Sequence, residues 1–335
     1  MCSNKLIPLV RSARWFAVLV ATALAVSEVT QAIAQGTRPH CGSQPLGAFA
    51  YDRSLSLDLR DSLAKIENGV EIHAISFASP RGGRATGLMF VPQHPAPGIK
   101  VPGVVMQHGM PGKAEYVSWV SANIAYHGAI VVALDAPFVR RGGDPVQFTA
   151  QDSVEQVQLI VDLQRAFDLL SGRSDVDAKR LAFVGRSYGA AMGGLLAGVE
   201  HRPRTFVLIV GDGGLVTHYS AAGHSAELDG LPTDRRERWL ASMRPIEPIQ
   251  FIGCATGASF FFEAARRDDA VPTKDAVAYQ GAAPNPKVVR WYNLGHNLGW
   301  PALIDELDWL HRTLRTAPAG PQANMWCATK ERCPE

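Results

Sequence analysis

The chain has 335 residues, of which 47% are apolar and 19% are charged, and its formal net charge is +2. This composition excludes disordered and collagen-like chains, and a chain of this length can bury a large core. The small net charge gives no reason to expect nucleic acid or an anionic membrane surface as a partner.

Residues 1–34 have the features of a cleavable secretory signal. Three basic residues precede the apolar run 15–26, and a small-residue site follows at 32–34. The run is shorter than the roughly 20 residues that span a bilayer, although an uncleaved anchor is the alternative. Cleavage would remove three basic residues and one acidic residue, which leaves no net charge. We therefore expect a secreted or periplasmic protein without stable membrane insertion, and the oligomeric state stays open.

Four cysteines would remain after cleavage, and export permits disulfide bonds between them. Cys327 and Cys333 enclose a short loop, which favours that pair. The pairing of Cys41 and Cys254 stays open, and the alternative for Cys254, which lies in an apolar stretch, is an unpaired small buried hydrophobe. No cysteine or histidine spacing resembles a zinc site, and we expect neither a metal nor a cofactor.

Strands and helices are predicted to alternate through most of the mature chain. Residues 35–68 are interpreted as an N-terminal lead-in segment, 69–314 as the folded domain and 315–335 as a tail. The strands are mostly continuous apolar runs, which favours an α/β fold with a largely parallel sheet covered on both faces. The expected strands are 69–77, 85–91, 102–107, 129–134, 180–184, 205–210, 258–262 and 287–292, and the expected helices are 115–125, 152–171, 188–199, 273–282 and 301–314.

Residues 211–247 break this alternation. They contain two adjacent glycines, two histidines and a charged run that is typical of an exposed helix. We interpret the segment as a cap or lid inserted between two strands.

Ser187 is the candidate nucleophile, in the run Gly-Arg-Ser-Tyr-Gly at 185–189. The pattern alone is common, but here an apolar strand precedes it and a helix of small residues follows it. A strand, a sharp turn and a helix form the nucleophile elbow, which lifts a serine hydroxyl clear of the sheet. The alternative, an ordinary capping serine in a glycine-rich turn, is less favoured in this context.

A serine nucleophile needs a histidine base and a carboxylate that orients the base, and in this arrangement they follow in the order Ser, acid, His. His296 comes after the last predicted strand and fits the base. Asp268 and Asp269 follow the preceding strand and both fit the acid; we favour Asp268, with Asp212 as a third candidate. The remaining aspartates have an ordinary alternative as helix caps or as partners of arginines.

Two backbone N–H groups are needed to bind the oxyanion. Tyr188, directly after the nucleophile, supplies one. The loop 108–112 should supply the other, and Met110 is the better donor because Pro111 has no N–H. His108 is at least as well explained as a buried histidine that holds this loop.

The runs 108–112, 185–190, 266–272 and 291–296 resemble those of the dienelactone-hydrolase-like and prolyl-oligopeptidase-like branch of the α/β hydrolases. The resemblance covers roughly residues 69 to 314. It implies an α/β-hydrolase fold with a mostly parallel eight-stranded sheet, a Ser187–Asp268–His296 triad, and hydrolysis of an ester or related acyl bond without a cofactor.

We therefore expect a serine hydrolase of the carboxylesterase type acting on a small-molecule ester. A small serine peptidase or an acyltransferase would use the same triad, and a non-catalytic binding protein is the remaining hypothesis. Arg140, Arg141 and Arg186 are candidates for the substrate side, with solvated ion pairs as the alternative. Trp239 and Phe138 would form an apolar acyl pocket or belong to the core.

Overall fold

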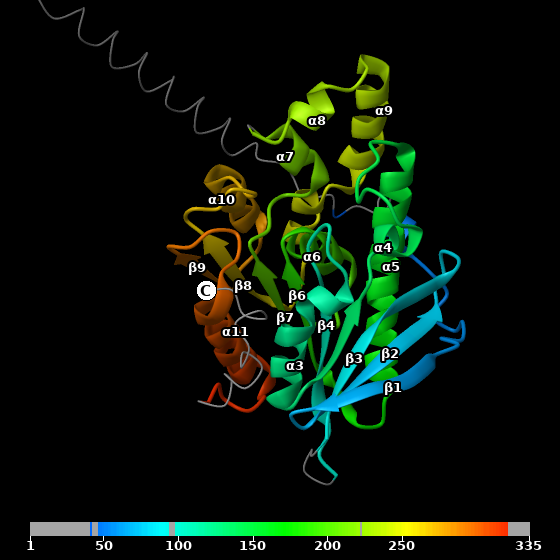
Figure 1. Cartoon of the computed structure of the whole chain (residues 1–335), viewed down its shortest axis with the longest axis vertical. Coiled ribbons are helices and arrows are strands. Elements are labelled where there is room, and N and C mark those ends of the chain that lie inside the picture. The colour runs from blue at the N-terminus through cyan, green and yellow to red at the C-terminus, as the bar shows by residue number, and fades with distance from the viewer. Residues whose placement is uncertain (1–40, 42–45, 94–97, 222, 321–335) are drawn as a thin grey trace, which may run out of the picture. The chain divides into compact units, whose positions relative to one another are not determined.

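The computed structural model describes residue 41 and residues 46–93, 98–221 and 223–320. These residues form a nine-stranded sheet in the order β1-β2-β3-β5-β4-β6-β7-β8-β9 (Figure 1). The strands are β1 (Arg60–Glu67), β2 (Val70–Ala78), β3 (Arg84–Pro92), β4 (Val101–Gln107), β5 (Ile130–Leu134), β6 (Val176–Arg186), β7 (Thr205–Ile209), β8 (Ser259–Ala265) and β9 (Lys287–Tyr292).

The sheet is antiparallel at one end and parallel through the rest. β1, β2, β3 and β5 pair antiparallel in that order, whereas β5, β4, β6, β7, β8 and β9 pair parallel. The six parallel strands therefore end at one edge of the sheet. In open α/β sheets this edge is where ligands bind.

Helices cover both faces of the sheet, as the apolar strands predict. Side chains alternate along each strand, so Val105 of β4 packs toward one face while Val104 and Met106 pack toward the other. The first face is covered by α5 (Ala150–Gly172), α6 (Tyr188–Val199) and α10 (Thr273–Ala282), and the second by α3 (Ser118–Tyr126) and α11 (Gly299–Leu314). The predicted α/β fold is confirmed.

The sequence prediction missed the first strand, because it placed residues 35–68 in a lead-in segment and expected eight strands. β1 pairs with β2 at the edge of the sheet, and every residue of β1 except the last is exposed. Leu63 and Ile66 are about half exposed, at 53% and 52%. Because neither face of β1 is buried, its sequence has no apolar alternation that would indicate a strand.

The segment between β7 and β8 is helical. It contains α7 (Leu215–Ser220), α8 (Ala226–Asp229) and α9 (Thr233–Met243), which lie together at the top of Figure 1. Short 3₁₀ turns follow at Arg244–Ile246, Pro248–Gln250 and Ile252–Cys254. Trp239 of α9 is buried and donates through Nε1 to Asp152 of α5 at 2.8 Å, which fixes α9 against the main body of the domain.

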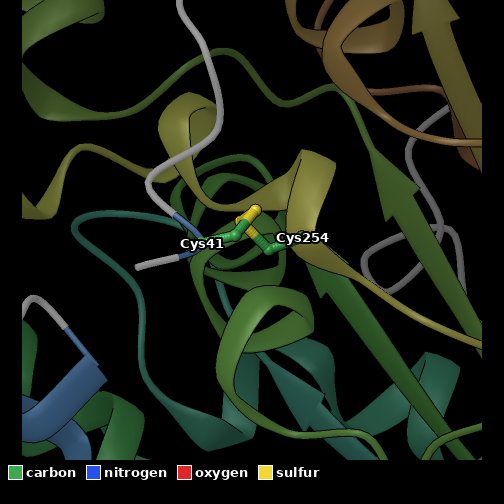
Figure 2. The surroundings of a disulfide bond; sticks show 2 residues. All are labelled: Cys41 and Cys254. Carbon is green, nitrogen blue, oxygen red and sulfur yellow. A yellow bond between two sulfur atoms is a disulfide. The ribbon is translucent and has the colours of Figure 1, made fainter. Parts of the chain in front are cut away.

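A disulfide bond joins Cys41 to Cys254, 213 residues apart, and ties the start of the described chain to the 3₁₀ turn before β8 (Figure 2). The alternative for Cys254, an unpaired buried hydrophobe, is therefore wrong. An apolar neighbourhood suits a half-cystine as well as a thiol, so local sequence does not distinguish them. Cys327 and Cys333 lie outside the described residues, and their pairing stays a prediction.

Removal of this disulfide should destabilise the domain. The bond closes a long loop and so restricts the unfolded chain, and we expect the Cys41→Ala, Cys254→Ala double variant to lose about 2–4 kcal/mol of unfolding free energy. Urea denaturation of the two proteins measures the difference. Dithiothreitol should lower the wild-type midpoint by more than that of the double variant, which keeps Cys327 and Cys333. Equal midpoints of the oxidised proteins would contradict the stabilising role of the Cys41–Cys254 bond.

Candidate functional site

Ser187 lies at a sharp turn between β6 and α6. β6 ends at Arg186 and α6 begins at Tyr188, and the φ angle of Ser187 is 52°, in the left-handed region that non-glycine residues rarely adopt. Its backbone N–H donates to the Ile209 carbonyl of β7 at 2.8 Å, which holds the strained residue in place. This is the strand-turn-helix geometry of a nucleophile elbow.

Glycine is required at 189 by the close approach of two backbones. A Cβ atom on Gly189 would lie 2.2 Å from the carbonyl oxygen of Gln107, at the end of β4. Real Cβ atoms do not approach an oxygen so closely, so any side chain would push α6 away from the sheet. The pattern around Ser187 therefore reflects packing as well as turn geometry.

His296 and Asp268 lie at the same edge of the sheet as Ser187, each just past the end of a parallel strand. His296 follows β9 and Asp268 follows β8. His296 Nε2 lies 2.9 Å from Ser187 Oγ, and His296 Nδ1 lies 2.8 Å from Asp268 Oδ1. With Nδ1–H donating to the carboxylate, Nε2 is free to accept the serine proton. The structure thus brings together the three residues that the sequence singled out.

Asp268 is held in its charged form. Burial disfavours the carboxylate, but hydrogen bonds from His296 and from the backbone N–H groups of Val271 and Ala270 outweigh burial and lower the pKa of Asp268 below its ordinary value. Asp269 is exposed, and its neighbour Asp268 is the residue that contacts His296. Asp212, the third candidate for the acid, contacts a different histidine, His218.

The loop 108–112 lies directly against the elbow. A Cβ atom on Gly109 would come within 2.9 Å of the Ser187 Cβ, so only glycine permits this approach. Met110 follows Gly109 and lines the same cavity as Ser187. Tyr188 is the first residue of α6, where a backbone N–H has no acceptor within its helix. Met110 and Tyr188 therefore both lie in segments that adjoin Ser187, and both line its cavity.

His108 has a structural role. Its Nε2 accepts from the backbone N–H of Ala136 at 3.1 Å, so its Nδ1 carries the proton and donates to the Gly109 carbonyl at 2.8 Å. Burial lowers the pKa of His108, which keeps the ring neutral. The residue pins the loop 108–112 between two strand ends.

Arg186 supports the loop that carries His296. Its guanidinium donates to Asn297 Oδ1 at 2.8 Å and to the His296 carbonyl at 3.4 Å. Glu263 and Glu306 are buried nearby; burial raises the pKa of Glu306 to about 8, and burial together with the charge of Glu306 raises that of Glu263. Arg186 therefore lies among buried acids, and it also lines a cavity together with Ser187 and His296.

The other predicted substrate-side residues lie away from the serine. Arg140 contacts Asp162 at 2.8 Å, and Arg141 contacts Glu155 at 2.7 Å. Trp239 packs against Phe148 and Tyr219. Neither arginine nor Trp239 is among the described residues that line the cavities beside Ser187.

A cavity of about 310 Å³ opens beside Ser187 and is bounded by the helical segment between β7 and β8. Its walls combine apolar side chains with a few polar ones. They include Met110, Pro111, Pro145, Leu215, Tyr219 and Val271, together with Ser187, Asp212, His218 and His296. A second cavity, of about 440 Å³, meets Ser187 and His296 from the side of Tyr116 and Trp119.

Sequence reasoning missed the pairing of Asp212 with His218 and the place of Tyr219 in the cavity wall. The sequence shows only that Asp212, His218 and Tyr219 follow β7 closely. Nothing in the local pattern shows that all three line the cavity beside Ser187. Within the described ranges, no group of three or more His, Cys, Asp or Glu side chains is arranged to hold a metal ion. None of the described helices is long and apolar enough to cross a bilayer.

No protein-family model and no curated protein sequence matches the chain. Many solved structures do. An acetyl xylan esterase from Paenibacillus sp. R4 is 19% identical, with a TM-score of 0.63, and the match covers 81% of this chain and 92% of that one. Acetyl xylan esterase 1 from Thermoanaerobacterium sp. JW/SL YS485 is 16% identical, with a TM-score of 0.64, over 81% and 93% of the two chains.

A putative dienelactone hydrolase from Klebsiella pneumoniae is 16% identical, with a TM-score of 0.52, over 73% of this chain and 98% of that one. At these identities the likeness concerns the fold. Together with the sheet order and the elbow at Ser187, it shows that this chain has the α/β-hydrolase fold.

Proposed function

We propose that this chain is an exported serine hydrolase that cleaves carboxylic esters of small molecules. The observation that carries the proposal is the unbroken chain of hydrogen bonds from Ser187 through His296 to Asp268, at the wall of a cavity. The esterases among the structures with this fold support the choice of an ester over an amide.

In the proposed reaction His296 Nε2 takes the proton from Ser187 Oγ as that oxygen attacks the ester carbonyl. The negative charge that develops on the carbonyl oxygen is stabilised by the N–H groups of Tyr188 and Met110. The C–O bond to the alcohol then breaks, and His296 returns its proton to the leaving oxygen. Asp268 stabilises the imidazolium between these two transfers.

Release of the acyl group repeats these steps with water as the nucleophile. His296 takes a proton from water, the resulting hydroxide attacks the acyl-serine carbonyl, and the proton passes to Ser187 Oγ as the acid leaves. Every group that this cycle needs is a side chain or a backbone N–H of the chain itself.

Residues 211–247 serve as the cap of this site in our proposal. Leu215, His218 and Tyr219 of α7 form part of the cavity wall, so substrates pass under this segment to reach Ser187. Tyr219 is supported from behind by Phe148 and Trp239 at ring distances of 4.9 and 6.1 Å. Trp239 thus acts on the cavity through Tyr219.

Export is supported by the Cys41–Cys254 disulfide, because such bonds persist in oxidising compartments. The signal-like residues 1–34 lie outside the described residues. Their basic start and short apolar run agree with the disulfide, and both favour secretion or a periplasmic location.

Replacement of the nucleophile should abolish turnover. We expect Ser187→Ala to reduce kcat/KM on p-nitrophenyl esters by at least roughly a thousandfold, because the hydroxyl forms the acyl-enzyme. The assay compares esters of increasing acyl length with p-nitroanilide peptides, and the exposed Ser54→Ala is the matched control. Full activity of Ser187→Ala would disprove the nucleophile, preferential amide cleavage would favour a peptidase, and no turnover of either class would favour a binding protein.

Variants of the two neighbouring aspartates show which of them is the acid of the triad. Asp268→Asn should lower kcat by about 10²–10⁴, because an amide at this position no longer stabilises the imidazolium or selects its tautomer. Asp269→Asn changes an exposed side chain and should alter kcat by no more than about threefold. Steady-state kinetics on one ester decides between them, and a larger loss in Asp269→Asn would reverse the assignment.

A further inference from the structure

A second Asp–His pair faces the same cavity as Ser187 but contacts neither Ser187 nor His296. His218 Nδ1 lies 2.9 Å from Asp212 Oδ2, and both residues line the 310 Å³ cavity. Asp212 is buried, with 6% of its side chain exposed, and its other oxygen accepts from the Gly214 N–H at 3.1 Å. Among the described residues His218 Nε2 has no partner, so this nitrogen is available to whatever occupies the cavity.

The pair is rigidly held. Glu247 is buried and accepts from the backbone N–H groups of Val216 and Thr217 at 3.2 and 2.8 Å, which anchors the first turn of α7. His218 lies one residue further along this helix. Its ring packs edge-on against Tyr219 and stacks on His224 at ring distances of 5.2 and 4.7 Å. A side chain fixed from so many directions is preorganised to bind rather than to adapt.

The charges around His218 are mainly acidic. Asp212 contacts it directly, Glu227 approaches from α8, and Asp275 approaches from α10, where Lys274 is adjacent. Burial disfavours the imidazolium, but the hydrogen bond and charge of Asp212 outweigh burial and raise the pKa of His218 above its ordinary value. The contact with Asp212 therefore favours the protonated form of His218 more than in a free histidine.

These surroundings discriminate between substrate groups. A carboxylate only accepts hydrogen bonds, so it would suit only the imidazolium, and three acids repel it. An alkyl group would leave His218 Nε2 desolvated without a hydrogen-bond partner. A hydroxyl both donates and accepts, so it can pair with Nε2 in either protonation state.

We propose that His218, oriented by Asp212, determines specificity by binding an uncharged hydroxyl group of the substrate in the cavity beside Ser187. The substrate class is then esters in which the acid or the alcohol carries a hydroxyl near the ester bond. This inference rests on the proposed esterase function, because it names the substrate of that same site.

The test compares pairs of esters that differ in one hydroxyl. p-Nitrophenyl 3-hydroxybutyrate is paired with p-nitrophenyl butyrate, and 2-hydroxyethyl acetate is paired with ethyl acetate, followed by acid release in a pH-stat. The readout is the ratio of kcat/KM values within each pair. We expect the wild type to favour the hydroxyl ester by at least about tenfold in one of the two pairs, which also shows on which side of the ester the cavity lies.

Three variants connect this ratio to His218. His218→Phe keeps a ring for Tyr219 and His224 but cannot form a hydrogen bond, and it should lower the ratio by at least about tenfold. His218→Gln keeps a side-chain donor and acceptor and should retain part of the ratio, which a purely structural role would not predict. His201→Phe, at the amino-terminal edge of the sheet, is the control and should leave the ratio unchanged.

The outcomes separate the two proposals. No turnover of any ester by the wild type would overturn the esterase function and this inference with it. Turnover with equal ratios in the wild type and His218→Phe would overturn the inference alone. A wild-type preference for p-nitrophenyl hydrogen succinate that disappears in His218→Phe would also overturn it, because an anion and not a hydroxyl would then be the bound group.

Discussion

The close contact between three backbone segments at Ser187 is the constraint on which the site depends. The start of α6 lies so near the end of β4 that only glycine fits at 189, and the loop after β4 lies so near the serine that only glycine fits at 109. At this contact Ser187 adopts its left-handed conformation, at the end of β6. The segments that carry Met110 and Tyr188, the proposed oxyanion donors, meet at this same contact.

The parallel arrangement of the strands brings the other two residues of the proposed triad to Ser187. Because β6, β8 and β9 run in one direction, residues just past their ends converge although they are 28 to 109 positions apart in the chain. Arg186 holds the loop that carries His296 through its hydrogen bond to Asn297. Glu263 and Glu306 lie near the guanidinium of Arg186. The position of His296 is therefore set by Asp268 at its ring and by Arg186 at its backbone.

The helical segment between β7 and β8 supplies much of the wall of the cavity beside Ser187. Its α7 is tied down by Glu247 and carries both an aromatic wall, Tyr219, and a polar residue, His218, into the cavity. One fold supports many functions, so the side chains that this segment adds to the cavity bear on the choice of substrate. The Asp212–His218 pair, to which we assign substrate specificity, lies in this same segment and lines the cavity.

The sequence by itself determined the elements with strong local signals: the α/β alternation, the elbow at Ser187 and the order of Asp268 and His296 after it. These were predictable because apolar strands, glycine turns and chain order are local properties. Tertiary structure alone decided that β1 is a strand, since both of its faces are exposed. It also decided that Cys254 pairs with Cys41, that Arg140 and Arg141 bind acids instead of lining the cavity, and that Asp212 faces His218. Each of these features depends on contacts between segments of the folded chain, and the local sequence pattern does not specify such contacts.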